Sequence, residues 1–181
     1  METVGFLELN SIAKGIEAAD KMLKAAEVRL VLARPSCPGK YNVLISGEVA
    51  AVQASVDAGV RVAGGNVVEQ LVIPRIHPQV IAAMNLSTLP EKLNAVGILE
   101  FFDVTASVLG ADAAVKAADI TLLEVRLGTG IGGKSFVIMT GDVAAVEEGV
   151  SCGARAAEAG GMLVSKVVIP NPHTELFKSL Y

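Results

Sequence analysis

The stretch VGFLEL, Val4–Leu9, returns in the second half of the chain as VGILEF, Val96–Phe101. Further residues repeat in the same order with only small insertions between them. They are Asp20 with Asp112, Lys24 with Lys116, Arg34 with Arg126, GEVAAV at 47–52 with GDVAAV at 141–146, and His77 with His173. So many matches with so few gaps indicate an internal duplication. We therefore expect a first domain over residues 1–88 and a second over 95–181, with a boundary at the polar stretch NLSTLPEKLN, 85–94.

Each copy predicts six elements in the order β-α-β-β-α-β. In the first copy the strands are expected over 4–9, 28–34, 40–46 and 67–73, with helices over 12–26 and from Val49. This order is the split βαβ, or ferredoxin-like, arrangement. We therefore predict an α+β protein with two tandem ferredoxin-like domains. Each should hold an antiparallel sheet with both helices on one face, and its other face needs cover from a partner or from the tail.

The predicted helices have clear apolar faces. Ser11 is placed to cap the first helix. We expect that helix to turn Ile12, Ile16, Ala19 and Leu23 toward the core, and the second helix to bury Val49, Val52, Val56 and Ala63.

Composition excludes several classes of function. Of the 181 residues 52% are hydrophobic and 19% charged, and the net charge of −4 argues against nucleic-acid binding. No basic run indicates a membrane surface, no apolar run is long enough to span a bilayer, and the N-terminus does not resemble a signal peptide. We expect a soluble cytoplasmic protein whose many short apolar side chains pack partly against neighbouring subunits.

The stretch GTGIGGKS, Gly128–Ser135, matches the pattern of a phosphate-binding loop. Such a loop needs a helix that begins at its Lys-Ser, because the helix N-terminus supplies the free N–H groups. Here FVIMTG follows, an apolar run that predicts a strand, and the next helix is expected only near Asp142. The loop should therefore join two strands, and nucleotide binding is not expected.

The equivalent loop of the first copy is RPSCPGK, Arg34–Lys40. It places Cys37 between two prolines at a loop tip. A single thiol cannot hold a metal cluster, but three chains meeting at a threefold axis would bring three Cys37 thiolates together. From these residues alone, an accidental exposed thiol remains an open alternative. The other cysteine, Cys152, is expected to be a small packing residue on its helix, and His77 and His173 are expected to be structural.

Together these motifs resemble the shell domain of bacterial microcompartments, twice, over nearly the whole chain. The resemblance rests on VGFLEL and VGILEF, on AADKMLKAAEVRL from Ala18, on the GEVAAV and GDVAAV helix starts, and on the endings VIPRIHP and VIPNPH. SIAKG at 11–15, CPGK at 37–40 and GIGGK at 130–134 are similar to the iron–sulfur branch of the tandem shell proteins, from propanediol-utilisation compartments. Such proteins form trimers that imitate a six-domain hexagonal tile.

The resemblance implies a function as well as a fold. The protein should be a non-enzymatic homotrimer in the shell of a bacterial organelle in the cytoplasm, tiling with other shell proteins. One iron–sulfur cluster per trimer, of the 4Fe–4S type, would be held in the central pore by Cys37 of each chain, for electron transfer with a redox partner or for cluster delivery. The implied pore-lining residues are Ser36, Pro38, Gly39, Thr129, Gly130, Ile131 and Gly132, and the implied edge contacts between tiles are Lys24, Arg75 and Lys116.

Two departures from the pattern bear on these expectations. The second loop has no cysteine, so three thiolates would leave one iron of a 4Fe–4S cluster without a cysteine from this protein. Arg75 becomes Asn171 in the second copy, so the two edges should differ. Two other functions stay open: a shell protein whose pore passes a small metabolite and holds no cluster, and a ferredoxin-like sensor that binds a small molecule.

Overall fold

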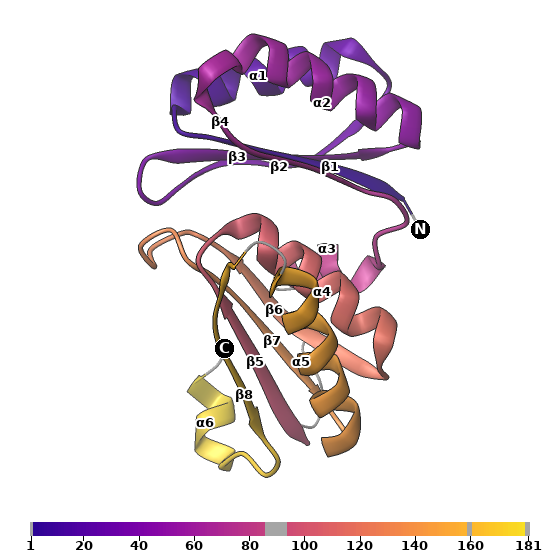
Figure 1. The fold of residues 1–181 in the computed structure, drawn as a ribbon, viewed down its shortest axis with the longest axis vertical. Helices are drawn as coiled ribbons and strands as arrows, with labels where there is room; N and C mark the ends of the chain where they lie inside the picture. Colours follow the sequence, from indigo (N-terminus) through magenta and orange to yellow (C-terminus); the bar gives the residue numbers. More distant parts are fainter. Residues whose placement is uncertain (1, 86–93, 159–160, 180–181) are drawn as a thin grey trace. The chain divides into compact units, whose positions relative to one another are not determined.

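A computed structural model describes residues 2–85, 94–158 and 161–179 (Figure 1). Most of the boundary stretch that the sequence predicts between the two copies, 86–93, lies outside the described residues. The chain divides into two compact units, residues 1–76 with 129–133 and residues 77–128 with 134–181.

Both domains have the predicted order of elements. The first consists of β1 Thr3–Leu9, α1 Ile12–Ala25, β2 Arg29–Ser36, β3 Lys40–Gly47, α2 Val49–Ala63, a 3-10 turn η1 Gly64–Asn66 and β4 Val67–Ile73. The second consists of β5 Ala95–Phe101, α4 Val104–Ala117, β6 Ile120–Leu127, β7 Ser135–Gly141, α5 Val143–Glu158 and β8 Leu163–Ile169. The strands form antiparallel sheets in the orders β2-β3-β1-β4 and β6-β7-β5-β8. The two tandem α+β domains with antiparallel sheets are therefore confirmed.

In each domain two helices lie on one face of the sheet, α1 with α2 and α4 with α5 (Figure 1). A side-chain N-cap begins both α1 and α4. Ser11 caps α1 as predicted, because its side chain accepts a hydrogen bond from Lys14 N–H at 3.4 Å. Asp103 does the same for α4 and accepts from Ala106 N–H at 2.6 Å. A polar oxygen at this position satisfies a backbone donor that the helix itself leaves without a partner.

The face of α1 that meets the sheet is not the predicted one. Ile12, Ile16 and Leu23 are exposed, Ile16 by 55%, and only Ala19 of the expected set is buried. The helix instead buries Gly15, Ala18, Ala19 and Met22. Mostly small residues are buried at this face because they let the helix axis approach the sheet closely. A Cβ on Gly15 would lie only 2.4 Å from Cβ of Tyr41, so the tyrosine ring occupies the space that a side chain would need.

The second helix of the first domain follows its prediction more closely. Val52, Val56 and Ala63 of α2 are buried in the same core as Leu7 of β1. Val49, which was expected to be buried, is exposed because it begins the helix, beyond the edge of this core.

Two short helices, α3 Pro78–Met84 and α6 Thr174–Ser179, follow the last strand of each copy and were not predicted. Both begin with a histidine cap. His77 Nδ1 accepts from Gln79 N–H at 3.3 Å, and His173 Nδ1 accepts from Glu175 N–H at 3.2 Å. The two histidines therefore have the structural role that the sequence predicted. Helix α3 packs on β6 and α4.

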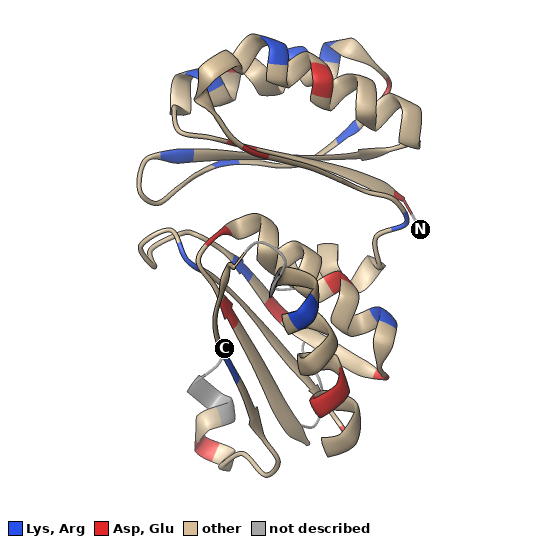
Figure 2. Ribbon diagram, in the orientation of Figure 1, with Lys and Arg blue, Asp and Glu red and all other residues tan. Residues whose placement is uncertain are grey.

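Charge is distributed over both domains without segregation of sign. Figure 2 shows basic and acidic residues on the helices and strands of each domain. None of the helices within the described ranges has the length and apolar character that crossing a bilayer requires.

Candidate functional site

The first candidate loop joins β2 to β3 by a tight turn of Cys37, Pro38 and Gly39. Ser36 holds its base: Ser36 O accepts from Gly39 N–H at 3.0 Å, and the buried Ser36 Oγ accepts from Asn42 Nδ2 at 3.1 Å. Gly39 has φ +81°, which a glycine adopts without steric cost, and the Cys37–Pro38 peptide is cis. The turn thus presents Cys37 as a half-buried free thiol at a tip fixed by hydrogen bonds.

The second candidate loop, Gly128–Lys134, joins β6 to β7 and is built on glycine. Gly130 and Gly132 have φ +77° and +68°, and a Cβ at either position would meet no atom within 4 Å. Thr129, Gly130 and Gly132 are exposed and Ile131 is half-buried. The loop therefore presents open backbone rather than side chains.

The phosphate-loop pattern does not have phosphate-loop geometry. Ser135 begins strand β7, as predicted, and the following helix α5 begins only at Val143. The chain continues from this segment as a strand, so the Gly-Lys-Ser segment does not itself begin a helix whose N–H groups would bind phosphate.

An ion pair anchors the base of each loop. Lys40 Nζ lies 3.0 Å from Oε1 of Glu8, a carboxylate on β1 that is almost fully buried. Lys134 Nζ lies 2.9 Å from Oε1 of Glu100, the equivalent residue on β5. Each pair ties the first residues after the loop to the central strand of its sheet, so the loops begin and end on a rigid support.

Across the part of the chain that the structure describes, side chains that could bind metal lie apart from one another. Among the described residues no three His, Cys, Asp or Glu side chains lie close enough to hold a metal ion together. Cys152 is not the packing residue that the sequence predicts: its half-exposed Sγ donates to Glu148 Oε1 at 3.0 Å and accepts from Arg155 Nη2 at 2.9 Å. Residues three or four apart lie on the same face of a helix, so Cys152 meets the polar side chains of Glu148 and Arg155 on the outer face of α5.

The expected edge residues lie on the surface in different settings. Lys24 is exposed and pairs with Asp20 at 2.6 Å, in a hollow also lined by Lys21 and Arg61. Lys116 is exposed and pairs with Asp112. Arg75 is exposed, with φ +53°. Outside glycine this conformation is uncommon, and asparagine, which stands at the equivalent position 171, tolerates it better than most residues.

Gln79 is a structural residue that was not predicted from the sequence. Its side chain accepts from Leu122 N–H at 2.9 Å and donates to Ile120 O at 3.4 Å, which fixes α3 on strand β6. A proline at the first helical position, Pro78, was the available signal for this helix.

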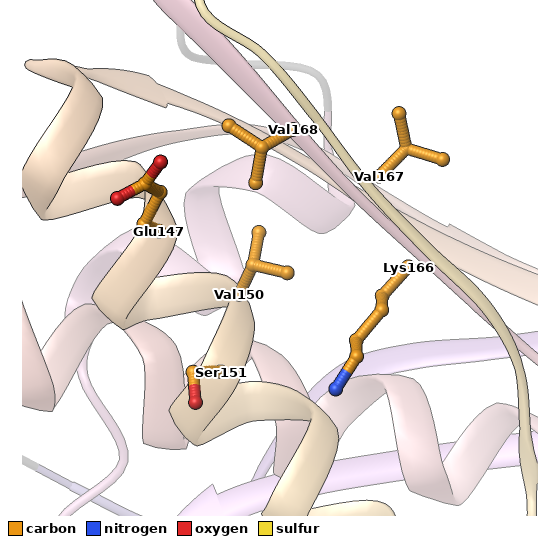
Figure 3. A pocket seen from close by; sticks show the side chains of 6 residues that line it. All are labelled: Glu147, Val150, Ser151, Lys166, Val167 and Val168. Carbon is orange, nitrogen blue, oxygen red and sulfur yellow. The ribbon is translucent and has the colours of Figure 1, made fainter.

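A shallow hollow in the second domain offers no comparable site. It lies between α5 and β8 and has a volume of about 190 Å³ (Figure 3). Its lining is Glu147, Val150 and Ser151 from α5 with Lys166, Val167 and Val168 from β8. This is below the roughly 300 Å³ at which ligand pockets begin. The polar ends of Glu147 and Lys166 also do not converge on one point (Figure 3), so the hollow gives the sensor alternative no support.

Comparison with known proteins agrees with this architecture. The BMC domain family model matches residues 3–76 and 95–172. The chain is 41% identical over 179 residues to the bacterial microcompartment shell protein PduT of Citrobacter freundii, which covers 99% of this chain and 97% of that protein. A crystal structure of a microcompartment protein from Desulfitobacterium hafniense DCB superposes with a TM-score of 0.93 at 52% identity, over 98% of this chain and 99% of that one.

A single-domain match shows the repeat independently. The carboxysome shell protein CcmK2 of Synechococcus elongatus is 44% identical over 78 residues, which is 41% of this chain and 76% of that protein. One repeat thus corresponds to most of a shell protein that is itself much shorter than this chain. The chain therefore belongs to the BMC-domain family: it is a tandem-domain, PduT-like protein of the bacterial microcompartment shell, with a structural role rather than an enzymatic one.

Proposed function

We propose that three copies of the chain form a six-domain tile whose central pore is lined by both candidate loops and holds one iron–sulfur cluster. The observation that carries this proposal is the Cys37 thiol, held at the tip of a hydrogen-bonded turn in a chain that matches tandem shell proteins over nearly its whole length. The pore-lining residues in this proposal are Ser36, Pro38, Gly39, Thr129, Gly130, Ile131 and Gly132.

The residues present fit such a cluster only if three chains contribute. Thiolate sulfur is the usual protein ligand of iron in these clusters, and Cys37 is the candidate donor on these loops. The absence of any three-donor group among the described residues means that a single chain does not supply a full ligand set. A threefold axis at the loop tips would bring three identical thiolates together. A cluster bound there would supply one-electron redox chemistry at the pore, for transfer to a partner across the shell or for cluster delivery.

A pore without a cluster is the second candidate, and the glycine loop favours it. Gly130 and Gly132 leave space beside the backbone and expose amide groups to whatever passes. In that case the loops would select a small polar metabolite by backbone hydrogen bonds, and Cys37 would be incidental.

The proposed tile also requires edges that meet other shell proteins. Lys24, Arg75 and Lys116 are the proposed contacts. All three are exposed, and Lys116 lies at the end of its helix. Because the residue equivalent to Lys21 is Ala113 and the residue equivalent to Arg75 is Asn171, the edge of the first domain is the more basic of the two.

The purified protein is expected to be a trimer at micromolar concentration. The apolar side chains that α1 leaves on the surface need cover, and only an assembly of copies brings three Cys37 loops together. Multi-angle light scattering should give three times the mass of the chain. A stable monomer across the micromolar range would contradict the proposed tile.

A further inference from the structure

Helix α3 closes the open edge of strand β6. In the order β6-β7-β5-β8 this strand is outermost, so alternate backbone groups on one side of it lack a partner strand. Gln79 supplies what a partner strand would: its Oε1 accepts from Leu122 N–H at 2.9 Å, and its Nε2 donates to Ile120 O at 3.4 Å.

A second anchor holds the same turn against α4. The backbone N–H of His77 donates to Asp112 Oδ1 at 2.8 Å, and the other oxygen of Asp112 pairs with Lys116. Asp112 is accordingly almost buried, with 10% of its side chain exposed. We call this contact between α3 and the second domain the joint. It has two parts: the backbone N–H of His77 bonds the Asp112 carboxylate on α4, and the amide side chain of Gln79 bonds the edge of β6.

The duplication repeats both halves of this joint. On the donor side, His173 caps α6 as His77 caps α3, and Glu175 stands where Gln79 stands. On the receiving side, the first domain has Asp20 for Asp112, Val28 for Ile120 and Leu30 for Leu122. The strands β2 and β6 also share an irregularity in pairing at the same place, after Leu30 and after Leu122.

The receiving surface of the first domain is nevertheless open. Leu30 is 41% exposed, whereas Leu122 is fully buried, and the side chain of Asp20 is 49% exposed. The apolar stripe of α1, formed by Ile12, Ile16 and Leu23, is exposed, whereas its equivalents Val104, Val108 and Val115 on α4 are buried. Within the described ranges no side chain forms a hydrogen bond to the backbone of Val28 or Leu30, the positions equivalent to those that Gln79 bonds on β6.

We propose that α6 of one chain docks on the β2 edge and α1 of a second copy. In this joint His173 N–H donates to Asp20, and the Glu175 carboxylate accepts from Leu30 N–H. The occupant is a second copy because the chain already carries this joint once, between equivalent residues, and because α6 exposes Thr174, Glu175 and Leu176. A head-to-tail contact of this kind closes into a ring when copies are related by a threefold rotation, so the inference rests on the proposed trimer and supplies its interface.

The proposed joint between chains differs from the joint made by α3 in one side chain, because Glu175 carries a carboxylate where Gln79 carries an amide. A carboxylate accepts from Leu30 N–H but has no N–H to give to Val28 C=O. Glu175→Gln should restore that second hydrogen bond and tighten each joint between chains by about fivefold. Misfolding would weaken the association between chains, so tighter association of this variant would not be explained by misfolding.

Sedimentation velocity over a dilution series compares the wild type with Glu175→Gln, with Leu30→Asp and with the control Glu69→Gln. Glu69 is an exposed residue of β4, at the opposite edge of the first sheet from β2, so its replacement makes the same change of charge outside the joint. We expect Glu175→Gln to remain trimeric at lower concentration than the wild type, Leu30→Asp to dissociate at higher concentration, and Glu69→Gln to match the wild type.

The outcomes separate this joint from the proposed tile. A trimer whose dissociation is the same in all four proteins would overturn the α6 joint and leave the tile standing. A monomer in all four at every concentration would contradict the tile and the joint together.

Discussion

Replacing Cys37 by serine is expected to remove all bound iron and sulfide from anaerobically prepared protein and to leave the trimer intact. Iron in such clusters is held mainly by thiolate sulfur, which a serine hydroxyl does not replace at equal strength. The turn itself should persist, because its hydrogen bonds come from Ser36, Gly39 and Asn42 and not from the thiol. Iron and sulfide analysis and the visible absorption spectrum measure the loss, and light scattering measures the trimer.

Cys152→Ser is the matched control, since it removes the other thiol of the chain. Cys152 lies within α5 and its sulfur contacts Glu148 and Arg155 of the same helix. This variant should keep the full iron content. Stoichiometric iron and sulfide in the Cys37→Ser protein would refute the role of Cys37 and leave the open metabolite pore as the better account of these loops.

Gly15→Ser is expected to cost about 3 kcal/mol of the free energy of unfolding. The added Cβ would lie 2.4–2.5 Å from Cβ, Cγ and Cδ1 of Tyr41, whose side chain is packed in the core of the first domain. Neither α1 nor β3 can withdraw without opening that core. Differential scanning calorimetry should show a fall in the melting temperature of roughly 6 °C or more.

The second domain suggests how to rescue this variant. It has Ser107 and Ser135 where the first has Gly15 and Tyr41, and both serines are fully buried. Gly15→Ser with Tyr41→Ser should therefore be less destabilised than the sum of the single variants, by at least about 1 kcal/mol. Gly65→Ser, at a glycine whose Cβ position is open, should change little. Strict additivity would show that helix and ring are not coupled as described.

The strands were predictable because two copies of one pattern had to agree. Val4–Leu9 and Val96–Phe101 alternate in the same way, and a strand boundary uncertain in one copy was fixed by the other. Ser135 was correctly predicted to begin a strand for this reason, since the equivalent stretch YNVLISG, 41–47, has no phosphate-loop character.

The face of α1 was not predictable from periodicity. Ile12, Ile16 and Leu23 form a stripe that resembles a core face, yet the helix buries the smaller residues around Gly15 and Ala18. Hydrophobicity ranks isoleucine above glycine, but the space beside Tyr41 admits only a residue without a side chain. In the proposed trimer a neighbouring copy covers this stripe, and the pattern of one chain does not distinguish such a surface from a core.

For Cys37 the sequence predicts the position of the residue but not its chemistry. Its place on a loop tip followed from the repeat and from the two flanking prolines, and the structure adds the hydrogen bonds that fix the turn. Its proposed chemistry depends on two further copies of the same residue, and symmetry between chains has no signature in the sequence of one chain. Gln79 was missed for a related reason, because a side chain that bonds a strand edge does so through tertiary position and not through periodicity.

Native mass spectrometry of protein purified without oxygen tests the proposed tile and its cluster most directly, because it weighs chains and cluster in one particle. The account predicts a single dominant species of three chains carrying one iron–sulfur cluster, with its mass falling by one cluster in Cys37→Ser. A trimer without iron, or a cluster carried by each single chain, would contradict the proposal that three Cys37 thiolates share one cluster at the pore.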